Sequence, residues 1–356
     1  MMTGRAARGD VHFVGSVPLA DADAVFRTLA RRFNGALARL PDGETGVRID
    51  WLQFQEEALA ATEALHPVNA EADYRNATAQ RKQRVQFALK PGFSMEAAAL
   101  PALGYAASAQ QAYASFRTLR AEGVIPHGCR FMVALPSPYN VISWAIADAS
   151  RAAVEPAYEE KLLRELDQIC TAIPAADLSI QWDCAHDMQA FDGARTPWFA
   201  PAREGIIERL VRIGDRVPPA AELGYHLCYG SFGGKHFVEP RDTGAMVALA
   251  NAVIDGVRRP VQFVHMPAPV ERFDDAYFAP LETLRLGPDT TLYLGLVHAT
   301  DTLEQARLRM QAARRSVARF GVAAECGFGR LPAAELPQLL QAHERALGAL
   351  RGSYEQ

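Results

Sequence analysis

The chain alternates short apolar runs with longer amphipathic stretches over most of its length. The short runs are rich in β-branched residues and end in turn-forming residues, which is typical of buried strands, whereas the longer stretches repeat apolar residues at helical spacing. Strands that alternate with helices indicate βαβ units and a parallel sheet. The expected strands cover residues 11–17, 36–40, 129–136, 178–184, 222–229, 261–266, 291–298 and 320–327. We therefore predict an α/β protein of the (β/α)8 TIM-barrel class.

The segment 47–128 interrupts this alternation between the second and third expected strands. We expect it to be mostly helical, with a break at Pro91–Gly92, and to form an insertion in a single barrel domain that spans 1–356. A doubly wound open sheet is the alternative. It would need a glycine-rich phosphate loop after the first strand, and the sequence there, "VGSVPLAD", lacks the Gly-x-Gly-x-x-Gly pattern. The barrel is the better prediction.

Composition excludes several classes of partner. The formal net charge is −4, and no stripe of Lys and Arg interleaved with aromatics marks a nucleic-acid surface. No segment approaches the roughly 18 uninterrupted apolar residues that a membrane helix needs. No apolar core of signal-peptide type follows the N-terminal arginines, so a cytoplasmic protein is expected. The 5 cysteines are scattered and odd in number, which argues against a disulfide framework, and we expect Cys129 and Cys170 to be small buried apolar residues.

Polar residues recur where the expected strands end. In barrel enzymes the catalytic groups lie at the C-terminal ends of different strands. Each residue alone could be a satisfied core or loop residue, but their recurrence at most strand ends predicts a site in the barrel mouth. These residues are Ser16, Asp42, Glu44, Asp183, His186, His226, Cys228, His265, His298 and Cys326.

The His226-x-Cys228 pair suggests what this site binds. Positions i and i+2 on a strand point to the same side, so both side chains can reach one ion. Cys326 ends the eighth expected strand and could converge on the same point. Thiolate and imidazole ligands together select zinc over magnesium or calcium. We therefore expect a zinc site at these three residues.

Motifs in the same order resemble the C-terminal catalytic barrel of cobalamin-independent methionine synthase, within the superfamily that also contains uroporphyrinogen decarboxylase. The chain looks like a short, single-barrel relative. The resemblance covers nearly the whole chain and rests on "VGSVP", "DGETG", "PSPYNVISWA", "IQWD", "HLCYG", "LGLVHATD" and "ECGFGR".

The resemblance implies roles for individual residues. It implies that His226, Cys228 and Cys326 bind zinc, which activates a small thiol such as homocysteine as a thiolate that attacks a methyl group. A free thiol has a pKa near 8.5, and coordination to zinc deprotonates it. The remaining implied roles are substrate binding by Ser16, Glu44 and Asp183, catalysis near the methyl transfer by His298 with Asp183, and stacking of Trp144 on the pterin of a folate donor.

Two departures from the family bear on the chemistry. The family's fourth zinc ligand is a glutamate, and this chain offers His265 in its place. Two thiolates and two neutral imidazoles cancel the charge of Zn²⁺, so a bound thiolate would be a weaker nucleophile and would suit a more reactive alkyl donor, hydrolysis or elimination. Alternatively, His265 is no ligand and water or substrate takes the fourth position. The chain also lacks the family's N-terminal barrel, so the donor could be a methylfolate, a methylated corrinoid protein or an unrelated compound.

Several alternatives stay open. His236 competes as a ligand, and His186 with Cys184 could support the site from behind or form a second one. Trp144 could simply pack in the barrel. The leading hypothesis is a zinc-dependent methyl or alkyl transferase acting on a small thiol. The others are a zinc-dependent lyase or hydrolase acting on a sulfur-containing small molecule, and a metal-free decarboxylase-like or binding barrel.

Overall fold

The computed structural model describes residues 9–75, 81–96, 99–232 and 235–352. Its centre is a curled, parallel sheet of seven strands in the order β1-β4-β5-β6-β9-β10-β11. Each of them overlaps an expected strand, so this part of the prediction is confirmed. The strands are β1 (Arg39–Pro41), β4 (Arg130–Pro136), β5 (Leu178–Cys184), β6 (Glu222–Leu227), β9 (Phe263–Pro267), β10 (Thr291–Val297) and β11 (Gly321–Ala324).

The N-terminal segment lies between the two outer strands of this sheet. Val11 forms parallel bridges with Leu37, just before β1, and with Val322 in β11. The amide of Val11 donates to the carbonyl of Ala36 over 3.2 Å. The expected strand over 11–17 is therefore reduced to a bridge at its first residue. The amide of His12 still donates to the carbonyl of Val322 in β11, but beyond His12 the backbone pairs with loops: Val17 donates to Gly43, and Ser16 accepts from Phe328.

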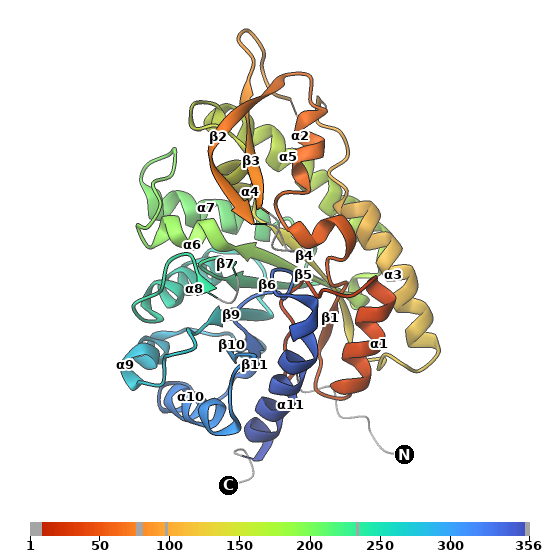
Figure 1. Ribbon diagram of the computed structural model, residues 1–356, viewed down its shortest axis with the longest axis vertical. Coiled ribbons are helices and arrows are strands. Elements are labelled where there is room, and N and C mark those ends of the chain that lie inside the picture. Colours follow the sequence, from red (N-terminus) through yellow and green to blue (C-terminus); the bar gives the residue numbers. More distant parts are fainter. Residues whose placement is uncertain (1–8, 76–80, 97–98, 233–234, 353–356) are drawn as a thin grey trace.

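Helices surround the sheet on its outer side (Figure 1). Their apolar faces supply the outer core: Val25, Phe26 and Leu29 of α1, for example, are buried. The longer helices are α1 (Ala22–Arg32), α3 (Tyr105–Ala121), α5 (Arg151–Ala172), α7 (Ala202–Gly214), α8 (Gly244–Gly256), α10 (Leu303–Ser316) and α11 (Leu336–Gly352). Short helices α4 (Pro138–Ala145), α6 (Ala185–Phe191) and α9 (Asp275–Phe278) follow the ends of β4, β5 and β9.

The segment 47–128 differs from the expectation of a mostly helical insertion. It contains the 3-10 helix Gly46–Asp50, helix α2 (Gln55–Ala60) and α3, but also an antiparallel hairpin of β2 (Leu65–Arg75) and β3 (Arg81–Leu89). The hairpin extends upward from the sheet in Figure 1. Alternation of polar residues with Val85, Phe87 and Leu89 carried the signal for β3. Phe87 is buried and bridges to Ile146, which ties the hairpin to the end of α4.

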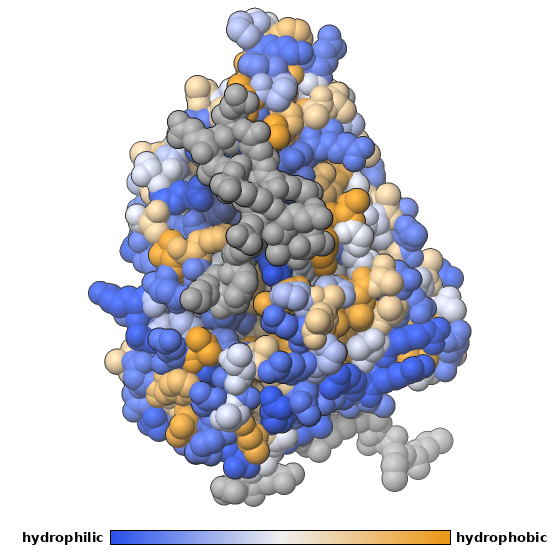
Figure 2. All heavy atoms as spheres, in the orientation of Figure 1, coloured by the Kyte–Doolittle hydropathy of each residue, from blue (hydrophilic) through white to orange (hydrophobic). Residues whose placement is uncertain are grey.

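The surface is mostly hydrophilic on the face shown in Figure 2, with scattered apolar side chains. Within the described part of the chain, no helix combines the length and the apolar character that a membrane crossing requires. The organisation of residues 1–356 as one domain stays a prediction.

Candidate metal centre

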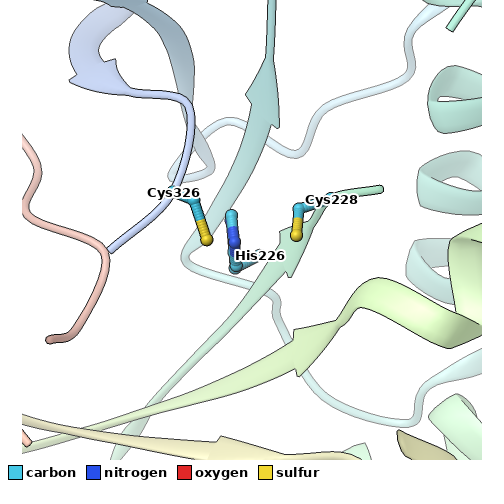
Figure 3. A group of neighbouring side chains, drawn as sticks. All are labelled: His226, Cys228 and Cys326. Atoms are coloured by element: carbon cyan, nitrogen blue, oxygen red, sulfur yellow. The ribbon is translucent and has the colours of Figure 1, made fainter. Parts of the chain in front are cut away.

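Three of the predicted ligands come together at one point of the sheet. The ligand atoms of His226, Cys228 and Cys326 all lie within 4.8 Å of one another. Figure 3 shows the three side chains converging from two separate parts of the chain. His226 is in β6 and Cys228 directly follows that strand, whereas Cys326 follows β11. Because β6 lies in the middle of the sheet and β11 at its end, the curl of the sheet brings the two sulfur atoms together.

The local backbone explains the His-x-Cys pair. The amide of Cys228 donates to the carbonyl of Cys184 over 3.3 Å, which continues the parallel pairing one residue past the end of β6. His226 and Cys228 therefore point to the same side. The Cys228 sulfur accepts a hydrogen bond from the amide of Gly230 over 3.2 Å. Both side chains are buried, which makes the pair a preformed half of a binding site.

His265 lies behind His226 and is not part of this group of three. It occupies the matching position on the neighbouring strand, since His226 and His265 are register partners in β6 and β9. Its Nδ1 lies 2.6 Å from Nδ1 of His226, and its Nε2 lies 3.0 Å from the carbonyl oxygen of Ala324. Both ring nitrogens of His265 are thus already hydrogen-bonded within the protein.

This pair of contacts determines which nitrogen of His226 can bind a metal. A carbonyl oxygen only accepts, so Nε2 of His265 must carry a proton and donate. Burial and the neighbouring histidines hold the pKa of His265 well below its usual value, so the ring is neutral and its Nδ1 accepts. His226 then donates from Nδ1, and its Nε2 keeps a free lone pair. That Nε2 is buried and has no nitrogen or oxygen partner among the described residues.

The two thiols are electrostatically coupled. A hydrogen bond from Cys228 first, and then the neighbouring His226 ring, hold the pKa of Cys326 well below its usual value. The same hydrogen bond, together with burial, raises the pKa of Cys228. One sulfur is therefore ready to act as a thiolate while the other keeps its proton until a cation displaces it. With the free Nε2 of His226, these atoms fit a soft or borderline metal ion and leave a fourth coordination position open.

Two predicted carboxylates face the same pocket. Glu44 and Asp183 line it together with Ser16 and the three candidate ligands. Burial raises the pKa of Glu44 to about 8, and burial with the nearby Glu44 charge raises that of Asp183 well above its usual value. Asp183 accepts from Nε2 of Gln181 over 2.8 Å. The pocket therefore presents carboxyl groups that a cationic group would stabilise in their ionised form.

Ser16 is held in place by residues close to the C-terminus of the chain. Its Oγ accepts a hydrogen bond from the amide of Gly329 over 3.0 Å. A Cβ built on Gly327 would lie 2.4 Å from this oxygen, so only glycine fits there. Asp42, also considered from the sequence, instead forms an ion pair of 2.5 Å with Arg48 and accepts from the amide of Glu44. Asp42 thus shapes the loop that carries Glu44.

His298 and Trp144 lie apart from this pocket. His298 lines a neighbouring pocket that shares Cys326 and Arg330 with the first one. Its Nδ1 lies 3.5 Å from Oε2 of Glu325, and burial lowers its pKa to about 3. Trp144 is at the end of α4 and is absent from the lining of both pockets. The structure therefore places His298 beside the candidate ligand Cys326 and Trp144 farther away.

The remaining histidines and cysteines form no second group of three ligands among the described residues. His236 lies 3.4 Å from Oε1 of Glu325 and is not part of the cluster. His186 accepts from or donates to the hydroxyl of Ser143 over 2.5 Å. The buried thiol of Cys184 donates to the carbonyl of Trp182. A supporting role for His186 and Cys184 stays a prediction.

Sequence reasoning assigned no role to several residues of the first pocket, among them Ile49, Trp51 and Arg330. Ile49 and Trp51 come from the connection after β1, and Arg330 follows Cys326 by four positions. Arg330 was visible in the "ECGFGR" motif. No periodic pattern marks Ile49 and Trp51, because they lie in and directly after the short 3-10 helix Gly46–Asp50, within a connection whose path depends on tertiary contacts.

Comparisons with known proteins support the fold alone. A structure from Listeria monocytogenes, provisionally assigned as a vitamin-B12-independent methionine synthase, has a TM-score of 0.51 and 12% identity, and the match covers 93% of this chain and 86% of that one. A methyltransferase from Methanosarcina mazei has a TM-score of 0.47 and 11% identity over 95% and 94% of the two chains. No protein-family model matches the sequence. No curated protein matches it either.

Proposed function

We propose that this chain is a zinc-dependent transferase that moves a methyl or alkyl group to a small thiol. The observation that carries the proposal is the sharing of one pocket by a His-Cys-Cys cluster and two buried carboxyl groups. A soft metal ion keeps a thiol in its nucleophilic thiolate form at neutral pH. An amino-acid thiol also carries an ammonium group, which can be the cationic partner of the two carboxyl groups. We further propose that the sheet closes through the bridges of Val11 into a (β/α)8 barrel.

His226 Nε2 and the sulfur atoms of Cys228 and Cys326 would hold the zinc ion. When bound, zinc supplies the Lewis acidity that keeps a substrate thiol deprotonated. Glu44 and Asp183 would pair with the substrate ammonium group, and pairing would return their raised pKa values toward the ordinary range. Ser16 would donate from its hydroxyl to the substrate carboxylate.

His298 would act on the donor side of the reaction. It lines the neighbouring pocket, which Cys326 also lines, and its ring is neutral because burial lowers its pKa to about 3. Its Nε2 is buried without a hydrogen-bond partner in the described part of the chain. A neutral imidazole placed there can hold or move a proton at the leaving group. A methylfolate or a methylated corrinoid protein would be the donor, and Trp144 remains a proposed stacking residue for it.

Metal analysis tests the proposal directly. We expect about one zinc per chain in the purified protein, and loss of most of it in Cys228→Ser and Cys326→Ser. Cys129→Ser is the matched control, since that cysteine is buried near the base of β4 and is not in the cluster. A wild-type protein that retains no zinc after addition and dialysis would rule the proposal out. Retention of zinc by both variants would do the same.

A zinc-dependent lyase or hydrolase is the second candidate. The observation that favours it is the absence of a carboxylate from the cluster of ligand atoms among the described residues. Without a carboxylate ligand the site is less anionic than one that has such a ligand, so the ion keeps more Lewis acidity and a bound thiolate is a weaker nucleophile. Cobalt-substituted protein separates the two candidates. A thiol that changes the visible spectrum favours transfer, and thiols that leave the spectrum unchanged favour lysis.

A further inference from the structure

Two arginine side chains meet at the C-terminal end of α4, and a third lies within electrostatic range of both. Arg84 lies on β3, Arg151 begins α5 and Arg195 lies in the loop after α6. Nη2 of Arg84 and Nη2 of Arg151 both donate to the carbonyl oxygen of Ser143, over 3.3 and 3.1 Å. Two guanidinium groups that share one oxygen atom must lie side by side.

Positive charge exceeds negative charge in this cluster. Burial first, and then the charges of Arg151 and Arg195, lower the pKa of Arg84 to about 10. Burial and the charge of Arg151 also lower the pKa of Arg195. A cation whose neighbours are cations is destabilised unless an anion joins them.

The described residues supply too little compensation. The end of one helix offers about half a negative charge. Asp148 forms an ion pair with Arg151 over 2.7 Å, but its side chain is 87% exposed, so solvent screens it. Glu56 acts on Arg84 more weakly than Asp148 does. Within the described part of the chain, no carboxylate forms an ion pair with Arg84 or Arg195.

Hydrogen-bond donors also remain unused. Among the described residues, nothing accepts from Nη1 of Arg84, from Nη1 of Arg151 or from either Nη of Arg195. Arg195 makes only a 3.3 Å bond from Nε to Gln189. Aromatic rings hold the guanidinium groups in place, because Arg84 lies 4.5 Å above the ring of Trp144 and Arg151 lies 5.7 Å from that of Trp198. Guanidinium groups that are held in place and keep unused N–H donors are well suited to carboxylate or phosphate.

We propose that Arg84, Arg151 and Arg195 form a subsite that binds the oxyanion, carboxylate or phosphate, of a small-molecule substrate. The buried ring of His186 lies next to this subsite, because its Nδ1 is 2.5 Å from the hydroxyl of Ser143. Burial first, and then the charges of Arg195, Arg84 and the pocket residue Arg330, lower the pKa of His186. Assignment of the oxyanion to a substrate of the metal centre rests on the proposed function. The subsite itself stands on the arginine geometry.

Anion binding by the full-length protein tests the subsite. Inorganic phosphate and glutarate are titrated separately into wild type by calorimetry at low and at moderate salt. We expect saturable binding that weakens with salt. Tighter binding of glutarate identifies a carboxylate ligand, and tighter binding of phosphate identifies a phosphate ester. Either result supports an oxyanion subsite.

Three variants make the test specific. We expect Arg84→Gln and Arg195→Gln each to weaken binding by about tenfold, the loss that follows from one charge-assisted hydrogen bond. Arg195→Gln is the safer variant for folding, since this side chain makes a single bond to Gln189. Arg164→Gln is the matched control, because Arg164 is an exposed residue of α5 that pairs only with Glu160 in the described structure. We expect it to bind both anions as wild type does.

Two results would overturn the subsite. One is wild-type protein that binds neither anion saturably. The other is unchanged binding in both Arg84→Gln and Arg195→Gln while thermal unfolding shows them folded. Zinc content is measured on the same samples. Protein that binds anions but no zinc would refute the proposed function and leave the subsite intact. Zinc-loaded protein that binds no anion would refute the subsite and leave the proposed function intact.

Discussion

His226 and His265 form a hydrogen bond of 2.6 Å between their two Nδ1 atoms, and the bond can run in only one direction. The carbonyl of Ala324 fixes the proton of His265 on Nε2, so His226 donates and presents Nε2 to the cluster. His265, which stands where the family has a carboxylate ligand, therefore has a role that requires no direct contact with a metal. It sets the tautomer and the orientation of the candidate ligand His226.

Replacement of His265 should weaken zinc binding without removing a ligand. We expect His265→Leu to lower zinc affinity by about 10- to 100-fold, as is usual when the partner of a ligating histidine is lost. His265→Asn should retain more affinity, because its side-chain oxygen can still accept from His226. Zinc dissociation constants from chelator competition measure both. His343→Leu removes another buried histidine, one bonded to Leu339 in α11, and serves as the control. Equal affinities of wild type and His265→Leu would contradict this role.

The stability of the substrate-free protein should depend on Glu44 in a defined pH range. Burial raises the pKa of this carboxyl from 4.5 to about 8 in the folded protein. The folded state therefore binds the proton more tightly, and the associated stability is complete below about pH 4.5 and is lost as the pH rises through about 8. The slope for one such group reaches about 1.4 kcal/mol per pH unit.

Glu44→Gln should reduce this slope, as measured by urea unfolding between pH 5 and pH 8 in steps of about one unit. The slope will not vanish, because burial raises the pKa of Glu325 to about 8 as well and adds to the same range. At the alkaline end the variant should be more stable than wild type. An identical pH dependence of the two proteins would show that Glu44 is ionised in the folded state.

Thiols that carry an ammonium group should bind better than thiols that lack one. Two carboxyl groups with raised pKa values lie beside the candidate ligands, and an ammonium group stabilises their ionised forms. We expect homocysteine and cysteine to raise the melting temperature more than 2-mercaptoethanol does. The difference should shrink in Glu44→Gln, while the response to 2-mercaptoethanol should stay the same. Equal shifts with all three thiols would argue against an amino-acid substrate.

Gly327 and Gly348 should respond to alanine in opposite ways. A Cβ on Gly327 would lie 2.4 Å from Oγ of Ser16, so Gly327→Ala should destabilise the protein by about 1–3 kcal/mol and displace Ser16. A Cβ on Gly348, within α11, meets nothing within 4 Å. Gly348→Ala should therefore stabilise the protein by about 0.5–1 kcal/mol through helix propensity. Thermal and urea unfolding measure both, and a stabilised Gly327→Ala would contradict the contact with Ser16.

Most of the sheet could be predicted because its signal is local. Runs such as 178–184 and 291–298 are apolar, β-branched and bounded by turns, and each became a strand buried on both faces. The exceptions have physical reasons. Residues after His12 follow loops and pair with Gly43 and Phe328, so the expected first strand is mostly absent. In the segment 47–128, the alternation of apolar and polar residues in β3 is short, and the charged residues of that strand obscured it.

The sequence by itself determined the alternation of strands and helices, and it determined that His226 and Cys228 share one side of a strand, because both follow from the period of the backbone. The tertiary structure decided the rest. Register between β6 and β9 put His265 behind His226 rather than beside the sulfur atoms. The curl of the sheet brought Cys326 across to Cys228, and the hairpin brought Arg84 beside Arg151. Register, curl and loop path depend on contacts between residues far apart in the chain, which no local pattern of residues encodes.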